Sequence, residues 1–204
     1  MFVYCSDKVF VEKINKEETM NRTGNYSAFY VKEPFKDTNL GANAVHDFCY
    51  YNTLRMWKAN DSTFPFVDSH NKNYNVRDDS SWETLCNRLR ERIRGSKNIV
   101  LFLSSITVES KALKEELEYG MSNQKLPVIV IYPEYSEKSD VADSAGIRQN
   151  IKNLWNKVPT FKKYMYDVAT IHVPMKQSVI RSALNDEDVM ISTMKPGTYY
   201  YKVQ

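Results

Sequence analysis

The sequence predicts an α/β fold in which an open, doubly wound parallel sheet of five strands carries helices on both of its faces. Two observations indicate this fold. From residue 25 onward, short β-rich apolar runs alternate with longer stretches of helical periodicity, which is the pattern of repeated βα units. The run at 98–104 is apolar on both faces, as expected for a central parallel strand with helices above and below it.

Each predicted strand is a short apolar run bounded by polar or turn-forming residues. The predicted strands are residues 25–31, 64–67, 98–104, 127–132 and 169–173, and the tail at 199–203 is a candidate edge strand. An acidic and serine-rich loop is expected at 133–146, between the fourth strand and the helix that follows it.

The predicted helices lie between these strands. They cover about residues 41–58, 81–95, 110–122, a stretch from 147 that ends near Pro159, and 176–185. The second helix is the clearest, because its apolar residues recur at helical spacing on a single face. Ser81 is its expected N-cap and Gly95 its expected end.

Length and composition limit the organisation of the chain. Its 204 residues suit one domain with a full hydrophobic core, so we expect an N-terminal extension at 1–24 and a single domain at 25–204. The net charge of +3 is too small for a nucleic-acid surface. The apolar runs fall far short of the roughly 18 residues that span a membrane, and the N-terminus does not resemble a secretory signal. We therefore expect a cytoplasmic protein that binds neither nucleic acid nor membrane.

Common cofactor and nucleophile motifs are missing from the sequence. It contains no P-loop, GxGxxG, HExxH or GxSxG motif. The cysteines, Cys5, Cys49 and Cys86, are widely spaced and form no metal-binding or disulfide pattern. We therefore predict no bound metal and no resident cofactor.

Polar residues at the strand ends are the first candidates for a site. In a sheet of flavodoxin-like topology, ligands bind beyond the carboxyl ends of the strands, where the strand order reverses. The loop after the second predicted strand opens with Asp68, Ser69 and His70, and the third predicted strand is followed by Ser104 and Ser105. These residues are candidates for contact with a substrate.

The third predicted strand and its helix carry a resemblance to a known fold. The apolar strand at 98–105 ends in serine, and the helix Ser110-Lys-Ala-Leu-Lys-Glu-Glu116-Leu follows it. This arrangement resembles the TIR fold, in which such a strand precedes a helix of the type S-x-W-x-x-x-E-L. Ala112 stands here at the tryptophan position.

A closer resemblance lies in the loop and the helix before that strand. The loop residues 68–70 and 74–78, with Leu89-Arg-Glu-Arg-Ile93 and Ser96-Lys-Asn98, resemble the bacterial TIR-like family of the MTH538 type, which includes the Thoeris antiphage ThsB proteins. The resemblance covers about residues 25–135, and the C-terminal third resembles the family only in topology.

The resemblance implies that the chain cleaves NAD between nicotinamide and ribose. NAD is then a substrate rather than a cofactor, and the product is a cyclic or conjugated ADP-ribose derivative that signals to a separate effector protein. The helix motif places the family's catalytic glutamate on Glu116, where a carboxylate can stabilise the oxocarbenium-like charge on the sugar. Self-association into a homo-oligomer is also implied.

Structural roles for the same residues remain open at this stage. Glu116 is alternatively a solvated helix residue, with Glu115 or Glu118 in the catalytic place. Asp68 can cap its loop, and His70 can bond to the backbone instead of touching substrate. The remaining substrate-binding candidates have alternatives too: Arg77 can pair with Asp78 instead of clamping phosphate, and Tyr30 and Phe35 can pack in the core instead of walling a base pocket.

Two other functions compete with NAD cleavage. A non-catalytic TIR module would assemble with itself or a partner and turn over no NAD. An enzyme that resembles nucleoside deoxyribosyltransferases would act on deoxynucleosides, also with a glutamate at the sugar. Fold analogy alone does not choose among these functions.

Overall fold

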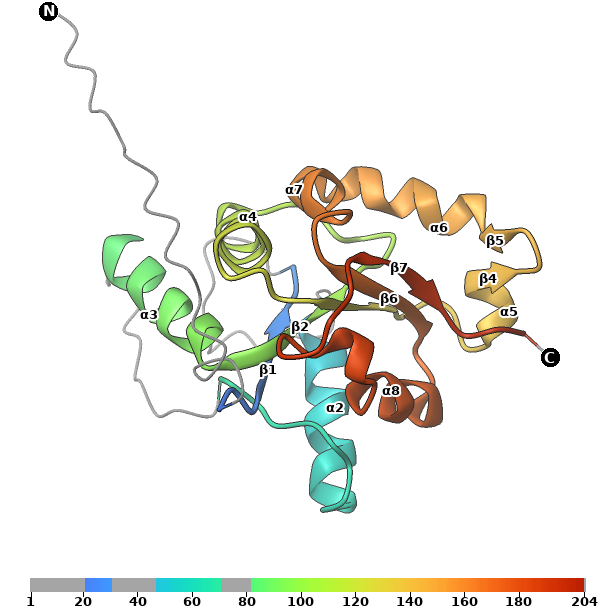
Figure 1. Cartoon of the computed structure of the whole chain (residues 1–204), viewed down its shortest axis with the longest axis horizontal. Coiled ribbons are helices and arrows are strands. Elements are labelled where there is room, and N and C mark those ends of the chain that lie inside the picture. The colour runs from blue at the N-terminus through green and yellow to red at the C-terminus, as the bar shows by residue number, and fades with distance from the viewer. Residues whose placement is uncertain (1–20, 31–46, 71–81, 204) are drawn as a thin grey trace, which may run out of the picture.

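The computed structural model describes residues 21–30, 47–70 and 82–203. Its centre is a five-stranded parallel sheet with the order β1-β2-β3-β6-β7 (Figure 1). The strands are β1 (Gly24–Ala28), β2 (Ser96–Phe102), β3 (Val128–Tyr132), β6 (Ala169–Pro174) and β7 (Gly197–Tyr200). The predicted fold class, an α/β doubly wound parallel sheet, is confirmed.

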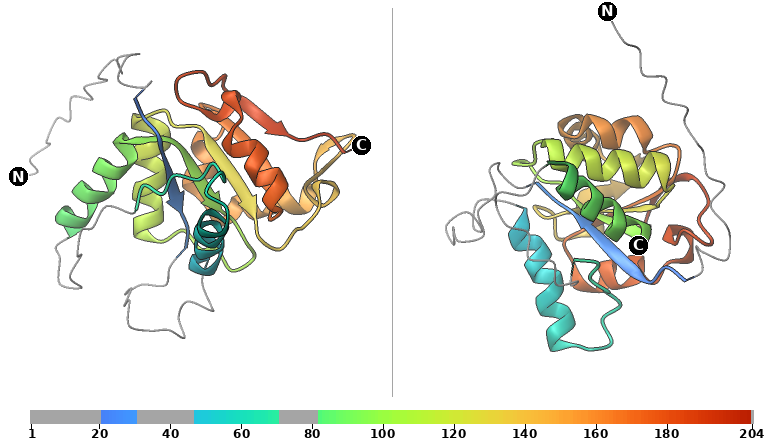
Figure 2. Two further views of the ribbon diagram at one scale, coloured as in Figure 1. Left: turned by 90° about the horizontal axis from the view of Figure 1, so that it is seen from below. Right: turned by 90° about the vertical axis from the view of Figure 1, so that its left-hand side faces the viewer.

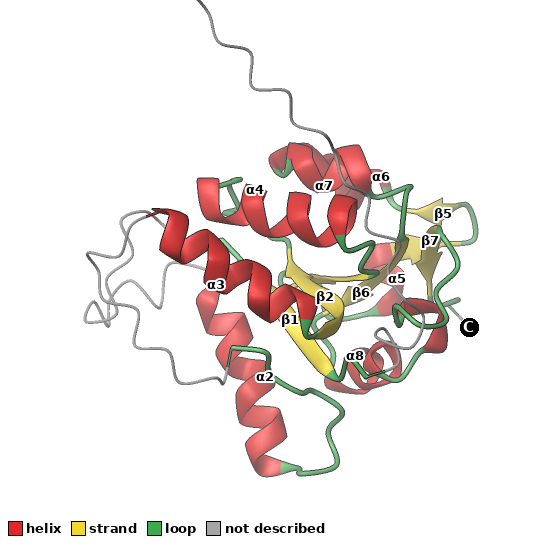
Figure 3. Cartoon of the chain, turned by 60° about the vertical axis from the view of Figure 1, so that its left-hand side comes forward, coloured by secondary structure: helices red, strands yellow, loops and turns green. Residues whose placement is uncertain are grey.

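Helices cover both faces of the sheet, as Figures 2 and 3 show. One face packs against α3 (Trp82–Arg94), α4 (Lys111–Leu117), α6 (Gln149–Leu154) and α7 (Pro159–Tyr164). The other face packs against α2 (Phe48–Asn60) and α8 (Gln177–Leu184). Short elements complete the described chain: η2 (Glu118–Asn123), α5 (Lys138–Val141), β4 (Ala142–Asp143), β5 (Gly146–Ile147), η3 (Trp155–Lys157) and η4 (Glu187–Val189).

The residue pattern explains the two cores. Every residue of β3 is buried, and successive side chains point to opposite faces of the sheet. Val128 and Val130 enter one core, and Ile129 and Ile131 enter the other. A strand that is apolar at every position is what a sheet covered on both faces requires. No helix in the described ranges is both long enough and apolar enough to cross a membrane.

The predicted strand at 64–67 is wrong. Phe64 and Phe66 are buried and alternate like strand residues, but of this run only the Val67 carbonyl pairs with β1, where it accepts the Asn25 N–H at 2.6 Å beside an isolated parallel bridge between Asp68 and Asn25. Pro65 interrupts the run and has no N–H to donate. The fifth strand is β7 instead. The candidate edge strand at 199–203 therefore forms, and it begins two residues earlier, at Gly197.

A buried asparagine takes over part of the missing strand pairing. The side-chain oxygen of Asn25 accepts a hydrogen bond from the Val67 N–H at 2.7 Å, and its amide donates to the Asn98 side chain at 2.8 Å. Asn98 in turn donates to the Val189 carbonyl at 3.0 Å. This chain of amides ties the 67–69 segment, β1 and β2 to η4.

One further prediction about the C-terminal half is corrected. The segment predicted as a loop at 133–146 contains α5 and most of the β4–β5 hairpin, which its polar composition concealed. The helical stretch from 147 ends near Pro159 as predicted, since α6 and η3 end before it. Pro159 then begins α7, because the first position of a helix needs no backbone donor. The predicted N-cap Ser81 lies outside the described residues.

Candidate active site

Glu116 lies on the inner face of α4, which follows β2. Ser110 caps this helix, and its side chain accepts a hydrogen bond from the Leu113 N–H at 3.2 Å. Leu113, Glu116 and Leu117 are the buried residues of the helix. Glu116 therefore occupies a core position on a helix whose register is fixed by its cap and its two leucines.

The neighbouring glutamates face other partners. Glu115 forms an ion pair with Arg90 of α3, with 2.7 Å between the guanidinium and carboxylate atoms. Glu118 accepts a hydrogen bond from the Tyr164 hydroxyl at 3.3 Å. Glu116 alone of the three is buried, with 9 % of its surface exposed. The structure therefore separates the three glutamates, which the sequence could not do.

A π-helix, η2, continues directly from α4 and is closely packed against the sheet. A Cβ atom added at Gly120 would lie 2.5 Å from Cδ1 of Ile99, so a larger residue there would require the end of the Ile99 side chain to shift. Single-turn π-helices are often found at functional sites. Here the wider turn begins two residues after Glu116.

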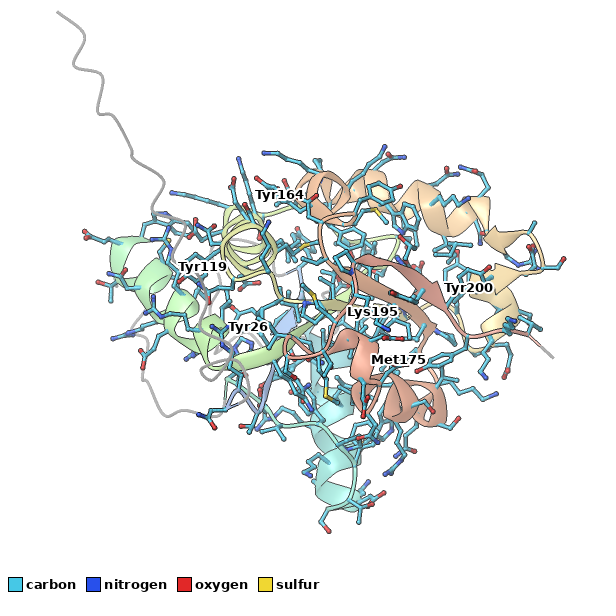
Figure 4. The ribbon with its side chains drawn as sticks, viewed as in Figure 1. Tyr26, Tyr119, Tyr164, Met175, Lys195 and Tyr200 are labelled. Carbon is cyan, nitrogen blue, oxygen red and sulfur yellow. The ribbon has the colours of Figure 1, made fainter. Side chains whose placement is uncertain are left out.

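The surroundings of Glu116 favour its uncharged form. Burial raises the pKa of this carboxyl to about 8, and the contact with Tyr26 and the positive charge of Arg92 oppose the rise. Burial, reinforced by Glu116, also raises the pKa of Tyr26 well above its usual value. Figure 4 labels Tyr26, which belongs to β1. Strand β1, helix α3 and helix α4 thus each contribute one polar group to the same buried cluster.

His70 completes this cluster from the segment beside β1. Its Nε2 lies 2.9 Å from the Ser27 carbonyl, so this nitrogen carries the hydrogen and Nδ1 is an acceptor. Nδ1 lies 3.5 Å from Nη1 of Arg92. The ring contacts the rings of Tyr26 and Tyr51, with centroids 4.8 and 5.7 Å apart. Burial lowers the pKa of His70 to about 4, so the ring is neutral near pH 7.

Asp68 supports His70 and shares Tyr51 with it as a neighbour. One carboxylate oxygen accepts the His70 backbone N–H at 2.9 Å, and the other accepts the Tyr51 hydroxyl at 2.6 Å. Arg55 lies 3.8 Å away as an ion-pair partner. Burial, with the bond to Asp68, raises the pKa of Tyr51. These contacts fix the loop that presents the histidine.

The structure places the other predicted site residues in different surroundings. The Ser69 hydroxyl lies 2.7 Å from that of Ser96, near the amino ends of β1 and β2 rather than the carboxyl ends. Tyr30 is half-buried, just past the carboxyl end of β1. Phe35 and Arg77 lie outside the described residues.

Ser104 and Ser105 lie at the carboxyl end of β2 and bond to neighbouring loops. The Ser104 hydroxyl donates to the buried Asp47 carboxylate at 2.7 Å, and Thr107 donates to the other oxygen of that carboxylate at 2.6 Å. The Ser105 N–H donates to the Glu134 carboxylate at 3.0 Å. Burial raises the pKa of Asp47 although the two hydroxyls oppose the rise. These bonds hold three loops together at this edge of the sheet.

The match to known proteins coincides with this cluster. Residues 26–138, more than half of the chain, match the model of a family described as Thoeris protein ThsB, TIR-like domain. The chain belongs to this family. The match begins at Tyr26 and also includes His70, Arg92 and Glu116. All members of the cluster therefore lie in the part that defines the ThsB TIR-like domain, whereas β6 and β7 lie outside it.

Sequence reasoning missed Tyr26 and Arg92 as members of the site. Tyr26 shares its strand face with Ala28, so the alternation along β1 points both of them into the same core. Arg92 lies next to Ile93, which is one of the buried residues of α3. The sequence signal that could have identified Tyr26 is a tyrosine on the buried face of a strand, because its hydroxyl needs a polar partner there.

The cluster can support proton transfer or the stabilisation of charge. A carboxyl with a pKa near neutrality exchanges between charged and uncharged forms at little cost, and strongly perturbed groups of this kind are common in active sites. No set of three or more His, Cys, Asp or Glu residues within the described chain has the arrangement of a metal site.

Proposed function

We propose that this chain cleaves NAD at the bond between nicotinamide and ribose, with Glu116 as the catalytic carboxylate. The observation that carries this proposal is the position of Glu116: it is the buried glutamate of α4, at the place that the helix motif assigns to the catalytic residue. Membership of the ThsB TIR-like family supports the same assignment.

The charge changes in the reaction define the role of the carboxylate. As the glycosidic bond breaks, its electron pair leaves with nicotinamide, which departs as a neutral molecule, and positive charge develops at the anomeric carbon. A carboxylate held against the ribose hydroxyls orients the sugar and stabilises this charge. Water, or a hydroxyl group of the nucleotide or of another acceptor, then bonds to the anomeric carbon and loses its proton.

The product and its use follow from the same proposal. We expect a cyclic or conjugated ADP-ribose derivative that carries a signal to a separate effector protein in antiphage defence. A second copy of the chain is a further proposed partner. Tyr30, Asp68 and His70 remain candidates for lining the substrate site, and Phe35 and Arg77 stay predictions from the sequence.

The test is mass spectrometry of NAD and its products after incubation with the purified protein and in lysates of phage-infected cells. Glu116→Gln keeps the shape of the side chain and removes its charge, so we expect it to lower turnover at least about 100-fold. Glu115→Gln is the matched control, because Glu115 faces Arg90 on the outer side of the same helix, and it should keep near wild-type turnover.

Each alternative function predicts a different result. If the wild type turns over no NAD in either setting, a non-catalytic interaction module becomes the better assignment. Turnover of deoxynucleosides without turnover of NAD would select the deoxyribosyltransferase-like activity. Equal NAD turnover by the wild type and Glu116→Gln would show that another residue supplies the catalytic group.

A further inference from the structure

The guanidinium of Arg92 lies against His70 and keeps one buried nitrogen without a hydrogen-bond partner among the described residues. Nη1 lies 3.5 Å from Nδ1 of His70, at the long end of hydrogen-bonding distance. Nε is buried and has no hydrogen-bond partner among the described residues. The charge of Arg92 acts on both Glu116 and Tyr26. A nearby positive charge can stabilise the charge on a buried carboxyl.

His70 is built to hold this guanidinium. Its ring is fixed by the bond from Nε2 to the Ser27 carbonyl and by the ring of Tyr26, and its backbone N–H is held by Asp68. Because Nε2 carries the hydrogen, the lone pair of Nδ1 points to Arg92. A histidine that is neutral near pH 7 can accept a hydrogen bond without repelling the cation.

We propose that His70 and Arg92 form a positioning pair, in which His70 holds the Arg92 guanidinium and the positive charge of the guanidinium favours the charged form of Glu116 that the reaction needs. This inference rests on the proposed catalytic role of Glu116. It assigns His70 a role through Arg92 in place of direct contact with the substrate.

The elements packed around α4 contain few other groups that compete for this role. Strand β1 supplies Tyr26, whose hydroxyl has no hydrogen bond of normal geometry within the described chain. On α3, Arg90 is paired with Glu115. On α7, the Tyr164 hydroxyl faces Glu118. Among the described groups, Arg92 is thus the cation whose charge acts on Glu116.

The first experiment needs no turnover. The protonation of Glu116 is followed by infrared difference spectroscopy in the free protein, with Glu116→Gln used to identify the carboxyl band. We expect Arg92→Met to raise the pH midpoint by about one unit, because it removes the nearby positive charge. His70→Leu should raise it by less, since it frees the guanidinium without removing it. Arg92→Lys should restore most of the wild-type midpoint.

Arg90→Met is the matched control, because it removes an arginine from the same helix that pairs with Glu115. We expect it to leave the midpoint of Glu116 unchanged. An unchanged midpoint in Arg92→Met, or an equal shift in Arg90→Met, would overturn the positioning pair.

The second experiment measures NAD turnover against pH. Arg92→Met should shift the acid limb of the kcat profile upward by the same amount, which lowers kcat about tenfold at pH 7 and restores it at higher pH. A uniform loss at all pH values, or a rise in KM alone, would contradict the proposal and indicate a structural or substrate-binding role. If the wild type turns over no NAD, the proposed function fails, whereas the titration still decides whether Arg92 and His70 control Glu116.

Discussion

Two clusters in this molecule each place a histidine against a buried tyrosine, and they use their polar atoms differently. In the cluster between β3 and β6, Trp155 donates to the Tyr132 hydroxyl at 2.8 Å, that hydroxyl lies 2.6 Å from Nδ1 of His172, and Nε2 of His172 lies 3.3 Å from the Thr170 hydroxyl. Every named group has a partner. In the cluster around Glu116, Nε of Arg92 has no partner among the described residues, and the Tyr26 hydroxyl contacts the Glu116 carboxyl without a hydrogen bond of normal geometry.

The difference separates a structural network from a candidate site. Burial lowers the pKa of His172 to about 3, so it stays neutral and its bonds persist over the whole working range of pH. A saturated network of this kind fixes the packing of α6, η3 and the sheet. Buried polar atoms without a hydrogen-bond partner lower the stability of a fold. Proteins keep such atoms mainly at functional sites.

The largest expected effect is on the pH dependence of folding. The pKa of Glu116 is raised from 4.5 to about 8, so the folded state holds a proton that the unfolded state has released. The free energy of unfolding should fall by about 1.4 kcal/mol per pH unit between these values. Glu116→Gln should remove this fall, so the variant gains stability over the wild type as pH rises, with a plateau above about pH 8.

Urea unfolding of both proteins from pH 6.5 to 9 measures this effect. His70 and His172 have lowered pKa values, so their contributions to the free energy of unfolding are lost mainly as pH falls below 6.5. The chosen range therefore reports Glu116 without them. Parallel stability curves for the wild type and Glu116→Gln would show that the carboxyl is not buried in solution.

A smaller effect is expected from the saturated cluster. Tyr132→Phe leaves the Trp155 N–H and Nδ1 of His172 buried without a partner, which should cost about 1–3 kcal/mol. Thermal unfolding measures the loss, and NAD turnover per folded molecule should not change. A loss of turnover in a fully folded variant would mean that the two clusters are coupled.

The same substitution in the other cluster should have a different result. Tyr26→Phe removes a hydroxyl whose contact with Glu116 is not a hydrogen bond of normal geometry, so the free energy of unfolding should change by less than about 1 kcal/mol. Thermal unfolding beside Tyr132→Phe gives a matched pair of tyrosine substitutions. Equal losses in the two variants would erase the distinction between the clusters.

The smallest effect is expected at the surface of α4. Glu115→Gln breaks an ion pair whose arginine side chain is 43 % exposed, so the loss should be about 0.2–1 kcal/mol and should shrink in high salt. Unfolding in low and high salt checks this value. A larger and salt-independent loss would show that the α3–α4 contact depends on this pair.

The sequence predicts elements that contain short apolar, β-rich runs and misses elements defined by hydrogen bonds. Strands β2, β3 and β6 are predicted because a sheet covered on both faces needs such runs. The run at 64–67 has the same apolar pattern, but such a pattern indicates buried side chains and not that the backbone pairs in a sheet. The side chain of Asn25 binds the Val67 N–H instead. Hairpin β4–β5 is polar and short, so no periodicity marked it.

The candidate site divides in the same way. Glu116 was found through a helix motif that local spacing preserves. Arg92 and Tyr26 join it only through tertiary packing between α3, α4 and β1, and no spacing along the chain records that contact. The hydroxyl of Ser104 was predicted to bind substrate, yet its partner is Asp47, 57 residues away in the sequence.

The pairing of β3 with β6 has a consequence for any attempt to shorten the protein. A chain cut after residue 138 would keep the cluster around Glu116 but lose β6, β7, α6, α7 and α8. Strand β3 would then be an exposed edge whose five residues are all apolar or aromatic, with unpaired backbone groups that can bind another copy. Such a fragment should aggregate. The C-terminal third contributes no residue to the Glu116 cluster, but it keeps the domain that contains this cluster soluble.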